Sequence, residues 1–129
     1  MQKFLPIAFL FMASTAQADT VDGLWRTAPQ DDGSYGFIKV ARCGDKICGT
    51  VLKGVNAAGE VATTGGNIGK QIIWDMVANG DGSYGGGKIW APDRDKTYDS
   101  EMILEDATLR VRGCILGICR DGGLWTRVY

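Results

Sequence analysis

Residues 97–114 have the sequence TYDSEMILEDATLRVRGC, in which apolar and charged side chains alternate. Met102 and Leu104 would lie on one face of an extended chain and Asp99 and Glu101 on the other, because successive side chains of a β-strand point to opposite sides. The arginines that follow alternate with aliphatic residues in the same way. The stretch therefore predicts two half-buried strands, Thr97–Glu105 and Leu109–Cys114.

Segments of the same kind recur along the chain, separated by Gly, Asp, Asn and Pro, which favour turns. No segment shows sustained helical periodicity. We therefore expect an all-β fold, an antiparallel up-and-down meander that closes into a small barrel, because closure removes exposed strand edges. The longest irregular piece, Asn56–Gly69, is predicted to be a loop or a short turn of helix. The eight predicted strands are Val21–Ala28, Tyr35–Cys43, Cys48–Val55, Gln71–Ala78, Ser83–Trp90, Thr97–Glu105, Leu109–Cys114 and Cys119–Tyr129.

Two glycine-containing patterns carry structural predictions. The tetrapeptide Asp-Gly-Ser-Tyr occurs at residues 32–35 and again at 81–84. It predicts one turn type feeding two strands, in preference to a repeated calcium loop, which needs more oxygen ligands. The three successive glycines 85–87 lie inside a predicted strand, so they predict a β-bulge that bends the strand at a barrel corner.

The N-terminal segment Met1–Ala18 has the features of a cleavable signal peptide. Lys3 precedes an apolar run that is far shorter than the roughly 20 residues of a transmembrane helix. The small residues Ala16 and Ala18 predict cleavage before Asp19. We therefore expect export to the bacterial periplasm, with residues 19–129 forming a single β-barrel domain.

The composition excludes several classes of function. The chain has 14 basic and 15 acidic residues and no histidine. It therefore has no basic patch for nucleic acid, and it has no histidine for a catalytic triad or a metal site. The carboxylates that follow Pro92 offer acid–base groups, but no nucleophile or catalytic motif accompanies them. We expect neither an enzyme nor a protein with a metal or other cofactor.

Four cysteines form two pairs with four intervening residues each. An oxidising compartment favours one disulfide in each pair, Cys43–Cys48 and Cys114–Cys119, each bridging directly opposed residues of a hairpin whose turn is the four residues between them. A four-cysteine zinc site and long-range pairing between the two pairs are the alternatives.

The sequence Gly23-Leu24-Trp25 near the start and Trp125-Thr126-Arg127 near the end resembles the calycin superfamily, which includes the lipocalins. A closer resemblance is to a family of exported bacterial proteins called domain of unknown function 2147. That resemblance also covers residues 38–40, 48–51, 87–92, 96–98, 109–113 and 119–120. It implies a small lipocalin-like barrel in which Gly23 lets the backbone pass closely and Arg127 covers the ring of Trp25. It implies no established activity.

Several large side chains are candidates to line the barrel interior or its mouth and to bind a small apolar ligand. The alternative is that they fill the core of a barrel that has no cavity. The candidates are Trp74, Met76, Trp90, Tyr98 and Met102.

We weigh two main functions on this basis. The first is a periplasmic barrel that binds a small apolar molecule, and the second is an envelope protein-interaction module, such as an inhibitor or an assembly partner. An outer-membrane barrel is a further alternative suggested by the C-terminal aromatic Tyr129. Arg127 would share the face of Tyr129 and meet lipid at a cost, so we expect a barrel that does not span the membrane.

Overall fold

The computed structural model describes residues 20–129, so the predicted signal peptide and its cleavage site before Asp19 lie outside the described residues. All regular structure in the described part is β, and no helix there is long and apolar enough to cross a membrane. The strands are β1 (Gly23–Arg26), β2 (Tyr35–Cys43), β3 (Lys46–Val55), β4 (Val61–Ala62), β5 (Gln71–Ala78), β6 (Ser83–Ala91), β7 (Lys96–Glu105), β8 (Thr108–Ile115) and β9 (Ile118–Arg127).

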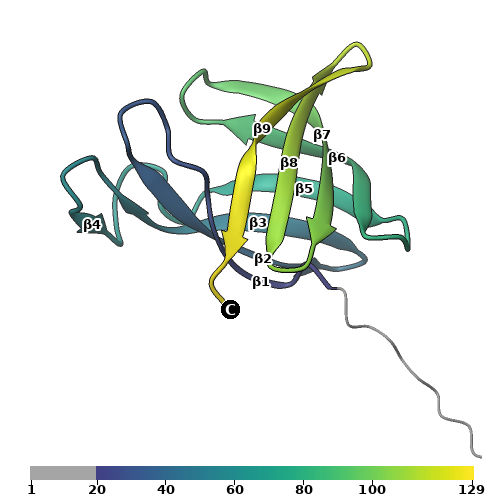
Figure 1. Cartoon of the computed structure of the whole chain (residues 1–129), viewed down its shortest axis with the longest axis horizontal. Coiled ribbons are helices and arrows are strands. Elements are labelled where there is room, and N and C mark those ends of the chain that lie inside the picture. Colours follow the sequence, from purple (N-terminus) through teal and green to yellow (C-terminus); the bar gives the residue numbers. More distant parts are fainter. Residues whose placement is uncertain (1–19) are drawn as a thin grey trace, which may run out of the picture.

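The predicted eight-stranded antiparallel barrel is confirmed. Each long strand pairs with the next along the chain, and β1 pairs with both β2 and β9, which closes the ring. The two-residue β4 lies outside this ring and pairs only with the end of β3, where Val55 faces Val61. Figure 1 shows the curved sheet and the loops that gather at its two ends.

The predicted strand bounds are right for β2 and β5 and wrong at the two ends of the chain. The first strand is shorter than predicted because the backbone before Gly23 crosses the end of the barrel, where the carbonyl of Val21 accepts a hydrogen bond from Trp25 Nε1 at 2.9 Å. The last strand ends at Arg127. Beyond it, Val128 and Tyr129 bond to the backbone of Leu24. The segment predicted as a loop or helical turn also contains β4.

Both glycine patterns behave as predicted. Asp32 and Asp81 each accept hydrogen bonds from the backbone and the hydroxyl of the serine two residues later, so the repeat forms the same turn twice. The triple glycine is a bulge, since the β6–β7 register shifts between Tyr84 and Gly87. A Cβ on Gly87 would lie 2.5 Å from the carbonyl oxygen of Trp74 on β5, so only glycine fits there.

The disulfides Cys43–Cys48 and Cys114–Cys119 are confirmed. Cys114 and Cys119 face each other directly, with Cα atoms 4.0 Å apart. The expectation of directly opposed residues is wrong for the first pair, because Cys43 faces Lys46 and the bridge runs diagonally over a Cα distance of 5.8 Å. The four-residue turns are also wrong, since pairing continues to two-residue turns in both hairpins. The two pairs lie at opposite ends of the barrel.

The core fills the end of the barrel where Leu24 meets the C-terminal residues Val128 and Tyr129. Its most deeply buried side chains include the two predicted methionines. They are Val21, Trp25, Val40, Ile73, Met76, Met102, Leu109 and Val111. Their packing leaves the opposite end of the barrel, toward the β8–β9 hairpin, less completely filled.

Candidate ligand-binding cavity

A cavity of about 1370 Å³ opens at the end of the barrel opposite Trp25 and Arg127. Its mouth is formed by four connections, which are the loops β1–β2, β3–β5 and β6–β7 and the tip of the β8–β9 hairpin. In Figure 1 these connections lie toward the upper left and top of the view. Because they come from strands distributed around the whole ring, the cavity is the barrel interior continued outward.

The floor of the cavity is apolar. Ile38 and Val111 are 2% exposed, and Trp125 is 5% exposed. All of the floor residues belong to or pack against the hydrophobic core, so a molecule that enters the cavity meets hydrocarbon at its base. The floor residues are Ile38, Val51, Ile72, Ile89, Val111 and Trp125.

The rim of the cavity is polar. Arg94 Nη1 donates a hydrogen bond to the Tyr98 hydroxyl oxygen at 3.3 Å. This bond, together with the nearby Asp93 carboxylate, raises the pKa of Arg94. Four basic and four acidic residues lie on the rim, so its charges are balanced in sign. They are Lys53, Arg94, Arg112 and Arg120 with Asp31, Glu60, Asp93 and Asp121.

The structure places the predicted ligand-lining residues in different parts of the barrel. Tyr98 lies on the cavity wall, whereas Met76 and Met102 are fully buried in the core at 0% exposure. Trp74 is half-buried and lines no part of the cavity. The set therefore does not come together as one site.

Trp90 ties two mouth loops to the barrel wall. Its indole Nε1 donates to Asp95 Oδ1 at 2.9 Å, and Lys70 Nζ lies 3.7 Å from the centre of its ring. Lys70 precedes β5 and Asp95 belongs to the β6–β7 turn, so the three residues join neighbouring loops. Trp90 thereby supports the mouth from outside the cavity.

The carboxylates that follow Pro92 each have a separate structural partner. Asp93 lies 3.7 Å from Arg94, Asp95 accepts from Trp90, and Asp99 pairs with Lys88. Glu101 lies beside Cys114 and Cys119, but both sulfurs are held in the disulfide and offer no thiolate to a metal. Neither group has the arrangement of an acid–base pair or a metal centre.

Gly23, Trp25 and Arg127 meet at the closed end, as the resemblance implied. The guanidinium carbon of Arg127 lies 4.5 Å from the centre of the Trp25 ring. Its two terminal nitrogens donate to the carbonyls of Asp22 and Thr20, both at 3.0 Å. A Cβ on Gly23 would lie 2.6 Å from the Tyr129 carbonyl oxygen. The three residues plug this end of the barrel.

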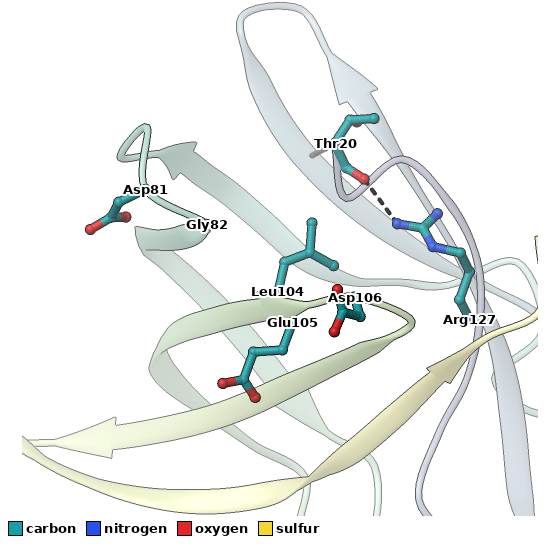
Figure 2. Close-up of a pocket in the computed structure, with 7 residues that line it drawn as sticks. All are labelled: Thr20, Asp81, Gly82, Leu104, Glu105, Asp106 and Arg127. Atoms are coloured by element: carbon teal, nitrogen blue, oxygen red, sulfur yellow. Dashed lines mark hydrogen bonds between the residues drawn. The ribbon is translucent and has the colours of Figure 1, made fainter. Parts of the chain in front are cut away.

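A smaller hollow of about 650 Å³ lies beside this plug. Figure 2 shows that the carboxylates of Asp81, Glu105 and Asp106 do not converge there, and that Arg127 turns toward the backbone of Thr20. The hollow has no apolar floor and no set of groups aimed at a common point. The larger cavity is therefore the candidate site.

Sequence reasoning missed the aliphatic floor. Ile38, Val51, Ile72, Ile89 and Val111 carry no local signal that separates them from core residues. Their distance from the mouth is set by strand register, which appears only once the barrel is closed.

The comparisons with known proteins agree with this architecture. A family model described as an uncharacterized protein conserved in bacteria (DUF2147) matches residues 23–127. A solved structure described as "Protein HP1028 from the human pathogen Helicobacter pylori belongs to the lipocalin family" is similar, with a TM-score of 0.71 and 17% sequence identity. That match covers 85% of this chain and 84% of the other, and at this identity it is a likeness of fold. A search of curated proteins found no matching sequence.

Proposed function

The chain belongs to the DUF2147 family, whose model spans nearly the whole barrel, and we propose that it is a lipocalin-like protein that binds a small apolar molecule in the open end of its barrel. The observation that carries the proposal is the buried aliphatic and aromatic floor beneath a polar rim. Small-molecule sites are typically concave and mostly apolar, with a few polar groups that fix orientation.

The size of the cavity supports this function. Ligand pockets commonly measure about 300–1,000 Å³. The cavity of about 1370 Å³ is larger than this range, so it has room for a small molecule.

The rim supports an oriented ligand. The Tyr98 oxygen accepts from Arg94, which leaves the Tyr98 hydroxyl hydrogen free to donate to a bound molecule. A ligand with one polar end would place that end near Tyr98 and its hydrocarbon toward Trp125. We expect such molecules to bind more tightly than fully apolar ones of the same size.

We further propose that the protein works in the periplasm and is not an enzyme. The predicted signal peptide supports export, and two disulfides suit an oxidising compartment. The separate structural partners of the carboxylates after Pro92 support a binding role.

The proposal is tested with protein purified from periplasm. Native mass spectrometry reports a co-purifying molecule, and displacement of an environment-sensitive naphthylamine dye measures binding of long-chain alcohols and fatty acids. Ile89→Trp adds bulk to the cavity floor and should abolish dye uptake. Leu52→Trp adds the same group at an exposed position of β3, where the side chain is 45% exposed, and should bind dye normally.

Two results would count against this function. One is a clean apo mass together with no dye binding by the natural protein. The other is equal dye binding by Ile89→Trp and the natural protein, with equal thermal stability, since that would place the dye outside the cavity.

A further inference from the structure

The tip of the β8–β9 hairpin, residues 115–118, is apolar and exposed. The exposed fractions are 53% for Ile115, 93% for Leu116 and 68% for Ile118. Leu116 is the most exposed large hydrophobic residue in the part of the chain that the structure describes. Figure 1 shows the hairpin extending beyond the rest of the barrel at the top of the view.

Leu116 has a backbone conformation that is energetically unfavourable for leucine. Leu116 and Gly117 have φ angles of 53° and 82°, the left-handed turn that normally takes Asn-Gly or Asp-Gly. Within residues 20–129 the other non-glycine residues with positive φ are Asp75, Asp95 and Asp106. Aspartate tolerates this conformation because its short polar side chain bonds locally, and leucine has no such compensation.

The other disulfide-closed hairpin provides an internal comparison. It turns through Gly44 and Asp45, which are both exposed and carry no apolar side chain. A short loop closed by a disulfide therefore does not require an apolar tip. The aliphatic side chains of residues 115–118 are unfavourable in water, and leucine is unfavourable in this turn. Neither the fold nor the disulfide explains them, which points to a role in binding.

The size and chemistry of the tip favour a membrane over a protein. A standard protein interface buries about 800 Å² on each partner and depends on Trp, Tyr and Arg anchors. A two-stranded tip of four residues offers far less area, and its large side chains are all aliphatic. A bilayer needs no matching surface and accepts isolated aliphatic side chains at its boundary.

The charges near the tip suit lipid headgroups. Arg120 follows the disulfide and is exposed, and its backbone pairs with Gly113, but its side chain makes no hydrogen bond or ion pair with residues 20–129. By contrast, Arg110 pairs with Asp121 at 2.8 Å and Arg112 pairs with Glu101 at 3.2 Å. An unpaired guanidinium beside a group that enters the hydrocarbon is placed to contact phosphate.

We propose that residues 115–118 insert into the surface of a phospholipid bilayer and hold the barrel mouth against it. Ile115, Leu116 and Ile118 also line the mouth of the cavity, so insertion would turn the opening toward lipid. The disulfide between Cys114 and Cys119 holds the base of the tip in one shape. This proposal is separate from ligand binding, because insertion of the tip does not depend on a molecule bound at the cavity floor.

Flotation with vesicles of phosphatidylethanolamine and phosphatidylglycerol tests the proposal with the full mature protein. The natural protein should float, and a high-salt wash should leave most of it bound, because the rim charges are balanced in sign. The double variant Leu116→Asn with Ile118→Thr removes two aliphatic side chains while suiting the turn and the strand. It should weaken partition at least about tenfold.

Two controls separate this proposal from ligand binding and from misfolding. Leu52→Thr removes an aliphatic side chain that is 45% exposed on β3 and should float normally. Ile89→Trp fills the cavity and should also float normally. If Ile89→Trp lost flotation, the cavity and not the tip would hold the lipid, and the proposal would be wrong.

Other outcomes would also overturn the proposal. They are failure of the natural protein to float and flotation of the double variant at the natural level. A third is a dimer in native mass spectrometry that becomes a monomer in the double variant, since the tip would then be buried by a second copy. Release of the natural protein by the salt wash would mean that charge alone holds it.

Discussion

Replacing Arg127 by methionine should destabilise the barrel without removing the cavity. The guanidinium stacks 4.5 Å from the Trp25 ring and donates to two backbone carbonyls. A cation–π contact contributes about 0.5–2 kcal/mol. Each hydrogen bond contributes about 0.5–1.5 kcal/mol, and the lower values apply to this half-exposed side chain. We therefore expect the free energy of unfolding to fall by about 1.5–3 kcal/mol.

For a domain of this size the loss corresponds to a fall in Tm of roughly 6–12 °C, at about 4 °C per kcal/mol. Circular dichroism of the thermal transition measures it. Arg127→Lys keeps the charge but loses the planar stacking and the fork of two donors. Its Tm should therefore lie between those of the natural protein and Arg127→Met. Dye binding at low temperature should be unchanged in both variants, because Arg127 lies at the opposite end of the barrel from the cavity floor.

The reasoning would be refuted if Arg127→Met melted within about 1 °C of the natural protein. It would also be refuted if the variant kept its Tm and lost dye binding, since Arg127 would then act at the cavity. Trp25→Phe, made alone and together with Arg127→Met, tests whether the side chains of Trp25 and Arg127 are energetically coupled. If they are, the double variant should lose less than the sum of the two single losses.

Three further predictions concern the fold. Gly87→Ala should lower the free energy of unfolding in urea by roughly 1–3 kcal/mol, because the new Cβ would lie 2.5 Å from the Trp74 carbonyl oxygen. Gly36→Ala is the control. It should be tolerated, because its Cβ would lie 3.5 Å from the Lys53 carbonyl oxygen. Removing the second disulfide as Cys114→Ser with Cys119→Ser should cost about 2 kcal/mol by urea unfolding, and dithiothreitol should then affect only the remaining bridge. Hydrogen bonds from Ser34 and Ser83 lower the pKa of Asp32 and of Asp81, so their contribution to stability is complete above the ordinary carboxyl pKa of 3.8 and is lost as the pH falls through the lowered values. The double variant Asp32→Asn with Asp81→Asn should therefore show a weaker acid dependence of Tm than the natural protein, and an unchanged acid limb would contradict the assignment.

Much of the fold was predictable because it depends on local chemistry. Alternation along Thr97–Glu105 reports which side chains share a face, and this holds for any strand whatever its neighbours. The bounds of β2 and β5 follow from turn residues on either side. The disulfide pairing was predicted from short separations in sequence together with an expected oxidising compartment. The contact between Trp25 and Arg127 was implied by family resemblance alone.

The candidate site was predictable only in part, because bulges interrupt the alternation. Asp75 adopts a left-handed backbone, and both Ile73 and Met76 on either side of it are fully buried. A second shift occurs between Tyr84 and Gly87. Counting by two along such strands misplaces the side chains beyond each bulge, so Met76 could not be assigned from its spacing.

The amino-acid sequence by itself determined the all-β class and the order of the antiparallel strands, and it favoured pairing each cysteine with its near neighbour, because each depends on residues near one another in the chain. Only the closed barrel decided that Met76 and Met102 fill its core while Ile89 and Trp125 lie at the floor of the cavity. The physical reason is that depth along a barrel axis depends on the register of all eight strands together. The position of the apolar tip, residues 115–118, beside the mouth of that cavity was likewise decided only by the tertiary structure.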